Sequence, residues 1–284
     1  RRRAEARRRG LSPAGGDIGG ARGGSRVRLV LSRDLRPMPR PTEPDDRPAD
    51  SGAEAGEAAA RANAFYGRRK GKPLRLGQAT AIADLLPRLA VDVATAPIDP
   101  RALFAIPVDD VRVESGFGGG EHLIETAKAD PSIGFIGAEP FVNGMAKALV
   151  AIHEAGLEDR IRLHHADSVL LLDALAPASI GRFYLLYPDP WPKKRHWKRR
   201  FVDRANLDRI ARVLRPGGEF RFASDWAPYV DWTLKRVLEH PAFEWTARTA
   251  DDWRRPWAGW PGTRYEEKAI REGRTPAYLV FRRV

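Results

Sequence analysis

The chain has 284 residues, of which 49 are Lys or Arg and 37 are Asp or Glu, and its formal net charge is +12. The absence of Cys excludes disulfide bonds and thiolate metal sites. No apolar stretch has the length of a membrane span, and no segment has the pattern of a signal peptide. We therefore expect a cytoplasmic protein without a membrane segment, and its charge favours a polyanionic partner.

Residues 1–60 differ in composition from the rest of the chain. They hold 13 Arg, no Lys and 9 acidic residues, in runs rich in Gly, Ala and Pro. Such a segment has little to bury, so we expect a disordered, low-complexity N-terminal extension. It is either a basic arm that adds nonspecific affinity for RNA or a dispensable extension, which is the simpler interpretation. The chain lacks an initiating Met, and we expect the native start at or near Met38.

A basic segment at 65–72 and a helical pattern at 78–89 come next, and from residue 111 onward strand and helix signals alternate. The expected strands are 111–115, 134–139, 161–167, 183–187, 219–224, 243–248 and 277–282. The expected helices are 121–129, 142–155, 168–175, 201–214 and 229–239. Repeated strand–helix units predict an α/β fold with a mostly parallel seven-stranded sheet and helices on both faces. The last two strands show no helix pattern between them, which indicates an antiparallel edge strand.

A glycine-rich turn at 114–122, with the sequence ESGFGGGEH, follows the first of these strands. Glycines at such a turn let the backbone approach a ligand closely and expose the amides of the next helix. The dinucleotide-binding pattern G-x-G-x-x-G would need Gly where Glu121 stands, which disfavours a nicotinamide-dependent dehydrogenase. The pattern is instead E-x-G-x-G-x-G, formed by Glu114, Gly116, Gly118 and Gly120. It resembles the first motif of class I methyltransferases, which use S-adenosylmethionine.

Acidic residues also end the next two expected strands. Glu114 suits the cationic methionine end of that cofactor, Glu139 suits both ribose hydroxyls, and Asp167 suits the adenine amine. Each alone is equally well explained as an exposed carboxylate at a strand end, but three of them beside the glycine turn favour one site. Ser115 stands where a buried parallel strand usually has an apolar residue, so its hydroxyl needs a partner if it is buried.

The fourth strand of the series leads into the segment YPDPWPKKRHWKRR at 187–200. The carboxyl ends of strands are where α/β sheets bind ligands, and the prolines beside Asp189 restrict its direction. Six of the eight residues at 193–200 are Lys or Arg, with His196 and Trp197 between them. This composition suits phosphate contacts and stacking on a base. A solvated helix start is the plain alternative, although basic residues there oppose the helix dipole.

The segment from Asp189 to Arg200 closely resembles the signature of bacterial tRNA (guanine-N7-)-methyltransferases, D-P-W-x-K-x-R-H-x-K-R-R. The resemblance runs from about Tyr66 to Val284 and includes Ser-Asp-Trp at 224–226 and Thr-Arg-Tyr-Glu at 263–266. It implies a Rossmann-like, class I methyltransferase domain over 61–284. That domain would transfer a methyl group from S-adenosylmethionine to N7 of a variable-loop guanosine in tRNA and form 7-methylguanosine.

The resemblance also implies the roles of individual residues. The cofactor would contact Glu114, Gly116, Gly118, Gly120, Glu139, Asp167 and Asp189, with Asp189 also the acidic residue of the catalytic site. The target guanosine would contact Lys193, Asp225, Thr263, Arg264, Tyr265 and Glu266. The tRNA phosphates would contact Lys194, Arg195, His196, Lys198, Arg199 and Arg200. We expect a monomer or homodimer without an obligate protein partner, and no metal, since no His has metal-ligand spacing.

Guanine N7 has an in-plane lone pair and no proton, so in-line positioning is the main catalytic task. A carboxylate would stabilise the positive charge that develops on the base. Which of Asp189 and Asp225 does so, and which selects guanine, stays open. One alternative is a methyltransferase acting on an exocyclic amine of another RNA base, which the place of Pro192 and the basic run disfavour. Another is a non-catalytic RNA-binding protein, which the acids at four strand ends disfavour.

Overall fold

The computed structural model describes residues 67–284, so the expected N-terminal extension and the start at Met38 lie outside the described residues. The strands are β1 (Asp110–Ser115), β2 (Ile133–Ala138), β3 (Ile161–His164), β4 (Ile180–Leu186), β5 (Leu214–Ser224), β6 (Phe243–Trp245) and β7 (Ala277–Arg283). The α-helices are α2 (Leu76–Thr80), α3 (Leu86–Leu89), α4 (Glu121–Ala129), α5 (Val142–Glu154), α6 (Ser168–Ala174), α7 (Arg204–Val213), α8 (Ala227–Leu238), α9 (Asp251–Arg254) and α10 (Arg264–Arg271). A π-helical turn, Ala81–Leu85, joins α2 to α3.

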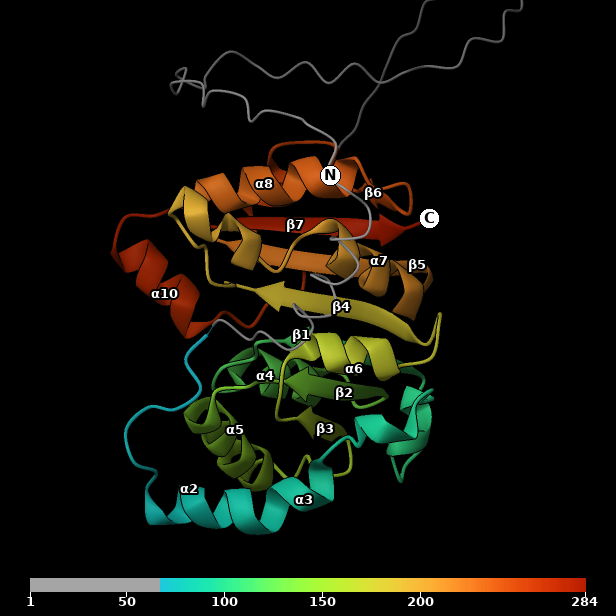
Figure 1. Cartoon of the computed structure of the whole chain (residues 1–284), viewed down its shortest axis with the longest axis vertical. Helices are drawn as coiled ribbons and strands as arrows, with labels where there is room; N and C mark the ends of the chain where they lie inside the picture. The colour runs from blue at the N-terminus through green and yellow to red at the C-terminus, as the bar shows by residue number, and fades with distance from the viewer. Residues whose placement is uncertain (1–66) are drawn as a thin grey trace, which may run out of the picture. The chain divides into compact units, whose positions relative to one another are not determined.

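The strands form one sheet in the order β3-β2-β1-β4-β5-β7-β6 (Figure 1). Strands β1 to β5 pair in parallel, and β7 runs antiparallel to both β5 and β6. The predicted mostly parallel seven-stranded sheet is confirmed. Its antiparallel strand, β7, lies one place inside β6, which forms the edge itself.

The expectation that no helix lies between the last two strands is wrong. Helices α9 and α10 lie there, and α10 starts at a capping box in which Thr263 and Glu266 satisfy each other's backbone amides. Of the residues in α10, only Glu266 and Ala269 are buried. Helix α10 has only eight residues and few apolar ones, so its apolar side is too short to be recognised as a helical pattern in the sequence.

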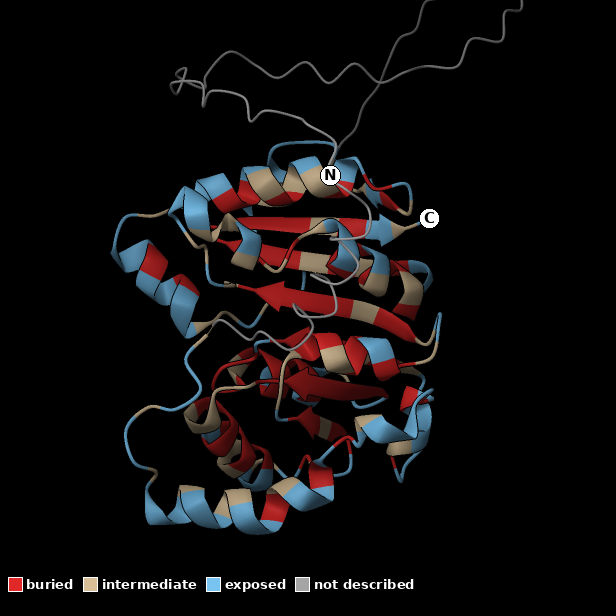
Figure 2. Ribbon diagram, viewed as in Figure 1, coloured by how far each residue is buried: buried red, intermediate tan, exposed pale blue. Residues whose placement is uncertain are grey.

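The central strands are buried because helices cover both faces of the sheet. Strand β2 is buried along its whole length, and successive residues Phe135 and Ile136 belong to two different apolar cores. One core packs side chains of the sheet against α6, α7 and α8, and the other packs them against α4 and α5. Figure 2 shows these buried strands between helices whose outer faces are exposed. Among residues 67–284, no helix is both long and apolar enough to cross a bilayer.

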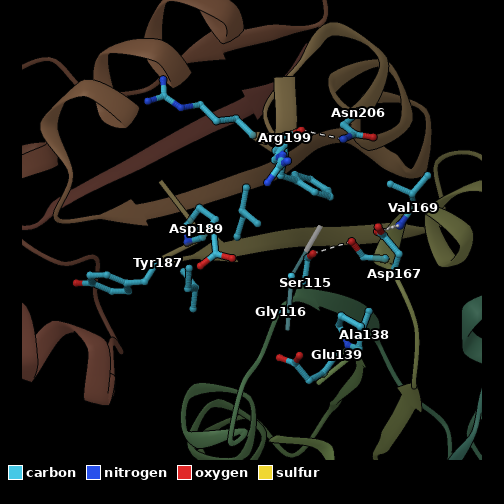
Figure 3. A pocket seen from close by; sticks show the side chains of 18 of the residues that line it. Ser115, Gly116, Ala138, Glu139, Asp167, Val169, Tyr187, Asp189, Arg199 and Asn206 are labelled. Atoms are coloured by element: carbon cyan, nitrogen blue, oxygen red, sulfur yellow. Dashed lines mark hydrogen bonds between the residues drawn. The ribbon is translucent and has the colours of Figure 1, made fainter. Parts of the chain in front are cut away.

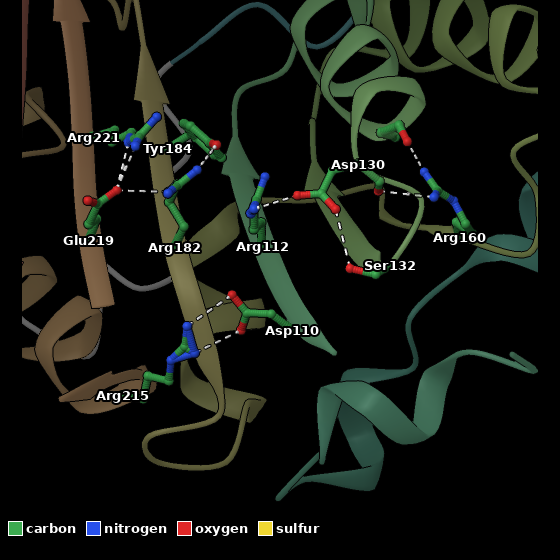
Figure 4. A network of polar contacts seen from close by, with 11 residues as sticks. Asp110, Arg112, Asp130, Ser132, Arg160, Arg182, Tyr184, Arg215, Glu219 and Arg221 are labelled. Atoms are coloured by element: carbon green, nitrogen blue, oxygen red, sulfur yellow. Dashed lines mark hydrogen bonds and ion pairs between the residues drawn. The ribbon is translucent and has the colours of Figure 1, made fainter. Parts of the chain in front are cut away.

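Charged side chains occupy alternate positions on the central strands, and ion pairs across the sheet satisfy them (Figure 4). Glu219 on β5 accepts from Arg182 on β4 at 3.0 Å and from Arg221 at 2.8 Å. Arg112 on β1 donates to Asp130 at 2.9 Å. These pairs let strands with charged residues sit half-buried while their intervening residues, such as Val113, reach the core.

Candidate active site

The carboxyl ends of the central strands open onto a cavity of about 500 Å³ (Figure 3). Strands β1 and β4 are neighbours there, at the point where the strand order reverses, which is the usual ligand site of such sheets. The residues singled out from the sequence that line the cavity are Gly116, Gly118, Glu139, Asp167, Asp189, Lys198, Arg199, Arg200, Arg264 and Tyr265. Those that do not border it are Glu114, Gly120, Lys193, Lys194, Arg195, His196, Asp225, Thr263 and Glu266.

The glycine-rich turn forms the floor of the cavity between β1 and α4. Gly116, Gly118 and Gly120 have φ angles of 71°, 59° and 82°, in the left-handed region that favours glycine. A Cβ atom at Gly116 would meet nothing within 4 Å, whereas one at Gly120 would lie 2.9 Å from Cβ of Ala148 on α5. Gly116 therefore leaves the backbone open to a ligand, and Gly120 lets α4 pack closely on α5.

Glu139 follows the end of β2 and is held by backbone amides. One carboxylate oxygen accepts from the amide of Gly118 at 2.7 Å, and the other accepts from the amide of Phe141 at 2.8 Å. Burial raises the pKa of Glu139 above its ordinary value, and the two amides oppose this effect. Because a carboxylate has about four acceptor sites, this arrangement fixes the side chain and leaves capacity for two ligand hydroxyls.

Asp167 and the neighbouring Ser168 connect the end of β3 to the cavity. Asp167 caps α6, with one carboxylate oxygen accepting from the amide of Val169 at 3.0 Å. Ser168 is buried, and its hydroxyl lies 2.7 Å from the hydroxyl of Ser115 at the end of β1. The hydroxyl of Ser115 thus has the partner that its burial requires, and the pair ties β1 to the start of α6.

Glu114 lies beneath the glycine turn, outside the wall of the cavity. It is 3% exposed, and its carboxylate lies 2.7 Å from Nδ1 of His122, which is equally buried. The His122 ring packs edge-on against Tyr184 at 4.7 Å and tilted against Trp260 at 5.1 Å. The two ends of the segment ESGFGGGEH thus meet as a buried pair that braces the turn.

Asp189 lies in the turn after β4 and faces the cavity. Within residues 67–284 no hydrogen bond or ion pair engages its carboxylate. Although the side chain is exposed to the cavity, the surrounding protein desolvates the carboxylate and raises its pKa. On either side of Asp189, Tyr187 and Trp191 have positive φ angles of 49° and 44°. Such angles are strained for residues other than glycine and cluster at functional sites.

The basic segment continues from this turn as a 3₁₀-helix over Lys194–Arg199. Lys193, Lys194 and Arg195 are exposed beside the cavity, and Lys198 is exposed at its border. The guanidinium of Arg199 lies over the Trp191 ring at 4.9 Å. Together with His196, whose ring lies edge-on to Trp191 at 5.8 Å, these side chains gather positive charge and aromatic surface at the rim of the cavity.

The α10 segment divides between the cavity and the protein interior. Arg264 and Tyr265 line the cavity, and the Tyr265 ring is stacked near Tyr187 at 6.4 Å. Glu266 is buried instead, where it accepts from Trp260 Nε1 at 2.7 Å and from the hydroxyl of Tyr278. Glu266 therefore holds α10 in place, whereas its two neighbours face the ligand space.

Asp225 follows β5 and forms an ion pair with Arg274 at 2.5 Å. Its carboxylate is half-buried, and it does not border the cavity. The same guanidinium also pairs with Glu272 after α10. The guanidinium of Arg274 thus neutralises part of the charge at Asp225. Asp189, by contrast, has no such cationic partner within residues 67–284.

Several residues that line the cavity were not expected from the sequence. They include Arg68, Phe141, Val169, Tyr187, Asn206 and Arg209. The basic segment at 65–72 carried a signal for Arg68, and Phe141 and Val169 follow two predicted acids closely. Nothing in the sequence marks Asn206, which reaches the cavity because α7 begins beside it and because its amide donates to the carbonyl of Phe201 at 2.8 Å.

The strand order, the glycine turn after β1 and the acids at the ends of β2 and β3 define a class I S-adenosylmethionine-dependent methyltransferase. A family model described as "Putative methyltransferase" matches residues 109–279, more than half of the chain. A tRNA (guanine-N(7)-)-methyltransferase from Azorhizobium caulinodans is 59% identical over 221 residues, covering 78% of this chain and 95% of that protein. The one from Rhizobium meliloti is 58% identical over 226 residues, covering 79% and 97%. The chain belongs to the tRNA (guanine-N(7)-)-methyltransferase family.

The residues of the cavity fit the cofactor of this class. Gly116 leaves open space beside the backbone, and Glu139 and Asp167 each keep acceptor capacity after their bonds to backbone amides. These are acceptors suited to the ribose hydroxyls and the adenine amine of a nucleoside. No group of three or more His, Cys, Asp or Glu side chains within residues 67–284 is placed to hold a metal ion.

Proposed function

We propose that this protein methylates N7 of a guanosine in tRNA, at the variable loop, and forms 7-methylguanosine. The observation that carries the proposal is the juxtaposition at one cavity of Asp189, whose carboxylate has no partner among residues 67–284, with a nucleoside site and a basic segment. The two relatives compared above, 59% and 58% identical, are named tRNA (guanine-N(7)-)-methyltransferases, which supports the same substrate. Methylation of an exocyclic amine on another RNA base finds no comparable support.

We assign the cofactor to the side of the cavity that is formed by the glycine-rich turn after β1 and by the acids that follow β2 and β3. Glu139 would hold the ribose hydroxyls, and Asp167 would accept from the adenine amine, while Gly116 and Gly118 admit the methionine portion. Glu114 would act on the cationic end of the methionine from beneath the turn, because His122 fixes its carboxylate there. Gly120 would contribute through the packing of α4 on α5.

S-adenosylmethionine supplies a methyl group already activated on a sulfonium centre, so the N–C bond to guanine N7 forms as the C–S bond breaks, with no proton to remove. The task left to the protein is to align the base with that methyl group. Positive charge grows on the purine during transfer, and a nearby desolvated carboxylate stabilises it. Asp189 fits this role better than Asp225, since Arg274 already pairs with Asp225.

The target base would enter between the Asp189 turn and α10. Tyr265 and Arg264 face the cavity from α10 and would contact the guanosine, with Lys193 at the rim. Thr263 and Glu266 would act indirectly, because their capping box sets the first turn of α10. Asp225 would likewise shape the guanosine site through its ion pair with Arg274.

The tRNA backbone would lie along the exposed basic side chains that follow Asp189. Lys194, Arg195 and Lys198 are exposed, and together with Arg199 and His196 they surround the mouth of the cavity. Each contact to a phosphate releases counterions, so tRNA binding should weaken steeply with salt. We also propose that the methyltransferase domain spans 61–284 and acts in the cytoplasm as a monomer or homodimer without an obligate protein partner.

The test is to incubate the protein with unmodified tRNA and S-adenosylmethionine, digest the RNA and identify its nucleosides by mass spectrometry. We expect 7-methylguanosine, and we expect Asp189→Ala to lose about 100-fold or more in rate, as for the removal of one stabilising group at an active site. Asp84→Ala, at an exposed position away from the cavity, is the matched control. A different methylated base would refute N7 of guanine as the target. Cofactor binding without any methylation would refute tRNA as the substrate.

A further inference from the structure

Arg200 ends the basic segment, but its surroundings differ from those of the other cations there. It is 3% exposed, whereas Lys194 and Lys198 are exposed. Its guanidinium lies over three aromatic rings, those of Trp197 at 5.0 Å, Tyr229 at 5.0 Å and Trp232 at 4.8 Å. A guanidinium enclosed in this way cannot reach a phosphate unless it leaves the cage.

The hydrogen bonds of Arg200 join two segments of the active site. Nε donates to the carbonyl of Pro190 at 2.9 Å, and Pro190 directly follows Asp189. Nη1 donates to the carbonyl of Pro228 at 3.4 Å in the first turn of α8. Arg200 therefore connects the turn after β4 to the helix after β5, so that the Asp189 turn is attached to a regular element.

No carboxylate in the described part of the chain forms an ion pair with Arg200. Among residues 67–284 its charge faces carbonyl dipoles and aromatic rings, and burial lowers its pKa. Burying a cation without a counter-ion costs free energy, and an apolar side chain would fill the same space at a smaller cost. Arg200 should therefore have a role other than packing.

That role concerns the turn after β4, to which Arg200 is hydrogen-bonded. Tyr187 and Trp191 have left-handed backbone angles on both sides of Asp189. Strained conformations of this kind persist only where surrounding contacts fix them. Since the Arg200 side chain bonds to Pro190 between Asp189 and Trp191, it acts on the middle of the strained turn.

We propose that Arg200 is a positioning residue for Asp189 and not a ligand of tRNA phosphates. The inference rests on the proposed function. Arg200 thereby has a different role from the exposed cations that precede it in the signature, such as Lys194 and Lys198. The exposed cations attract the tRNA, whereas Arg200 fixes the position of the Asp189 carboxylate that faces the base.

The test compares Arg200→Lys with Lys198→Ala in the full chain. Arg200→Lys keeps the charge but lacks the Nε–H that bonds to Pro190. We expect its kcat at saturating tRNA and S-adenosylmethionine to fall about 100-fold, as for a misplacement of about 1 Å at a reacting centre. The slope of log Kd for tRNA against log salt concentration should stay as in the wild type. Lys198→Ala should reduce that slope by about one.

Two results would overturn the inference: a reduced salt slope in Arg200→Lys, or an unchanged kcat for the folded fraction, whether or not the melting temperature falls. If Arg200→Lys does not fold, Trp232→Leu opens the same cage from α8 and removes one of the three rings that hold the guanidinium in place to bond to Pro190. This change also removes the hydrogen bond from Trp232 Nε1 to the carbonyl of Val202. It should lower kcat in the same direction and leave the salt slope unchanged, and a normal kcat would count against the inference. Failure of the proposed function is seen separately, as absent 7-methylguanosine with the wild-type protein.

Discussion

Substitution of Gly144 by Ala should disturb the cofactor site from outside the cavity. Gly144 lies in the first turn of α5, and a Cβ atom there would lie 2.4 Å from the carbonyl oxygen of Gly118. An ordinary contact needs at least 3.4 Å, so the turn or the helix must move by about 1 Å. The three nearest atoms, O, C and Cα of Gly118, all belong to backbone, which cannot rotate away as a flexible side chain would.

The movement acts on the hydrogen bond between the Gly118 amide and Glu139, which is 2.7 Å long. If that bond breaks, the Glu139 carboxylate moves and its charged hydrogen bond to a ribose hydroxyl of the cofactor weakens. Such a bond contributes about 1.5–3 kcal/mol, which corresponds to a loss of roughly ten- to a hundredfold in affinity for S-adenosylmethionine. Overpacking should also lower the free energy of unfolding by about 1–3 kcal/mol. The affinity for tRNA should change little, because the atoms nearest to Gly144 all belong to Gly118 and none to the basic segment.

Calorimetric titration with S-adenosylmethionine measures the first effect, and urea unfolding measures the second. Gly77→Ala is the matched control, since Gly77 also lies in a helix and a Cβ there would meet nothing within 4 Å. It should raise stability by about 0.5–1 kcal/mol and leave cofactor affinity unchanged. If folded Gly144→Ala binds the cofactor as tightly as the wild type, α5 does not hold the turn in place and the reasoning fails.

His122→Leu should leave buried Glu114 without its partner and reduce the free energy of unfolding by about 3–5 kcal/mol in urea titration, and a loss below about 1 kcal/mol would contradict this. Asp189→Asn should melt at a higher temperature than the wild type at pH 7 in differential scanning fluorimetry. The pKa of Asp189 is raised in the folded state, so the wild type loses stability as pH rises from the unfolded pKa through the folded one, and the difference should vanish at acidic pH. Ser115→Ala should reduce the free energy of unfolding by about 1–3 kcal/mol, because the buried hydroxyl of Ser168 loses its partner. The double variant Ser115→Ala/Ser168→Ala should lose less stability than Ser115→Ala, and an equal or larger loss would refute this role of the pair.

The parts of the fold that could be predicted are those where local pattern and tertiary structure agree. Strand β2 is apolar because it is buried on both faces, and the turn at Gly116 needs glycine because its φ is positive. Helix α10 escaped prediction because its stability comes from a cap and from Glu266 rather than from an apolar stripe. The position of α10 depends on Trp260 and Tyr278, which both donate to Glu266. The sequence alone does not show that these three residues are in contact.

The candidate site shows the same division. Glu139 and Asp167 could be placed from the sequence because strand ends of a parallel sheet share one edge. The state of Asp225 could not, because its partner Arg274 lies 49 residues further along the chain. Arg200 belongs to a local run of cations, and the packing of Tyr229 and Trp232 from α8 reveals that it is enclosed. Pattern indicates which residue types are present, whereas burial decides which of them face a ligand.

The cofactor end and the guanosine end of the site are joined through the protein interior, so a single substitution in the joining cluster affects both ends. Glu114 pairs with His122, whose ring packs on Trp260, and Trp260 donates to Glu266 in the α10 cap. Residues in one such cluster have non-additive effects. Loss of activity in Glu266→Ala would therefore report the collapse of the cap before it reports a lost substrate contact. Tyr278→Phe removes one hydrogen-bond partner of Glu266 and keeps its carboxylate. It therefore distinguishes the collapse of the cap from the loss of a substrate contact.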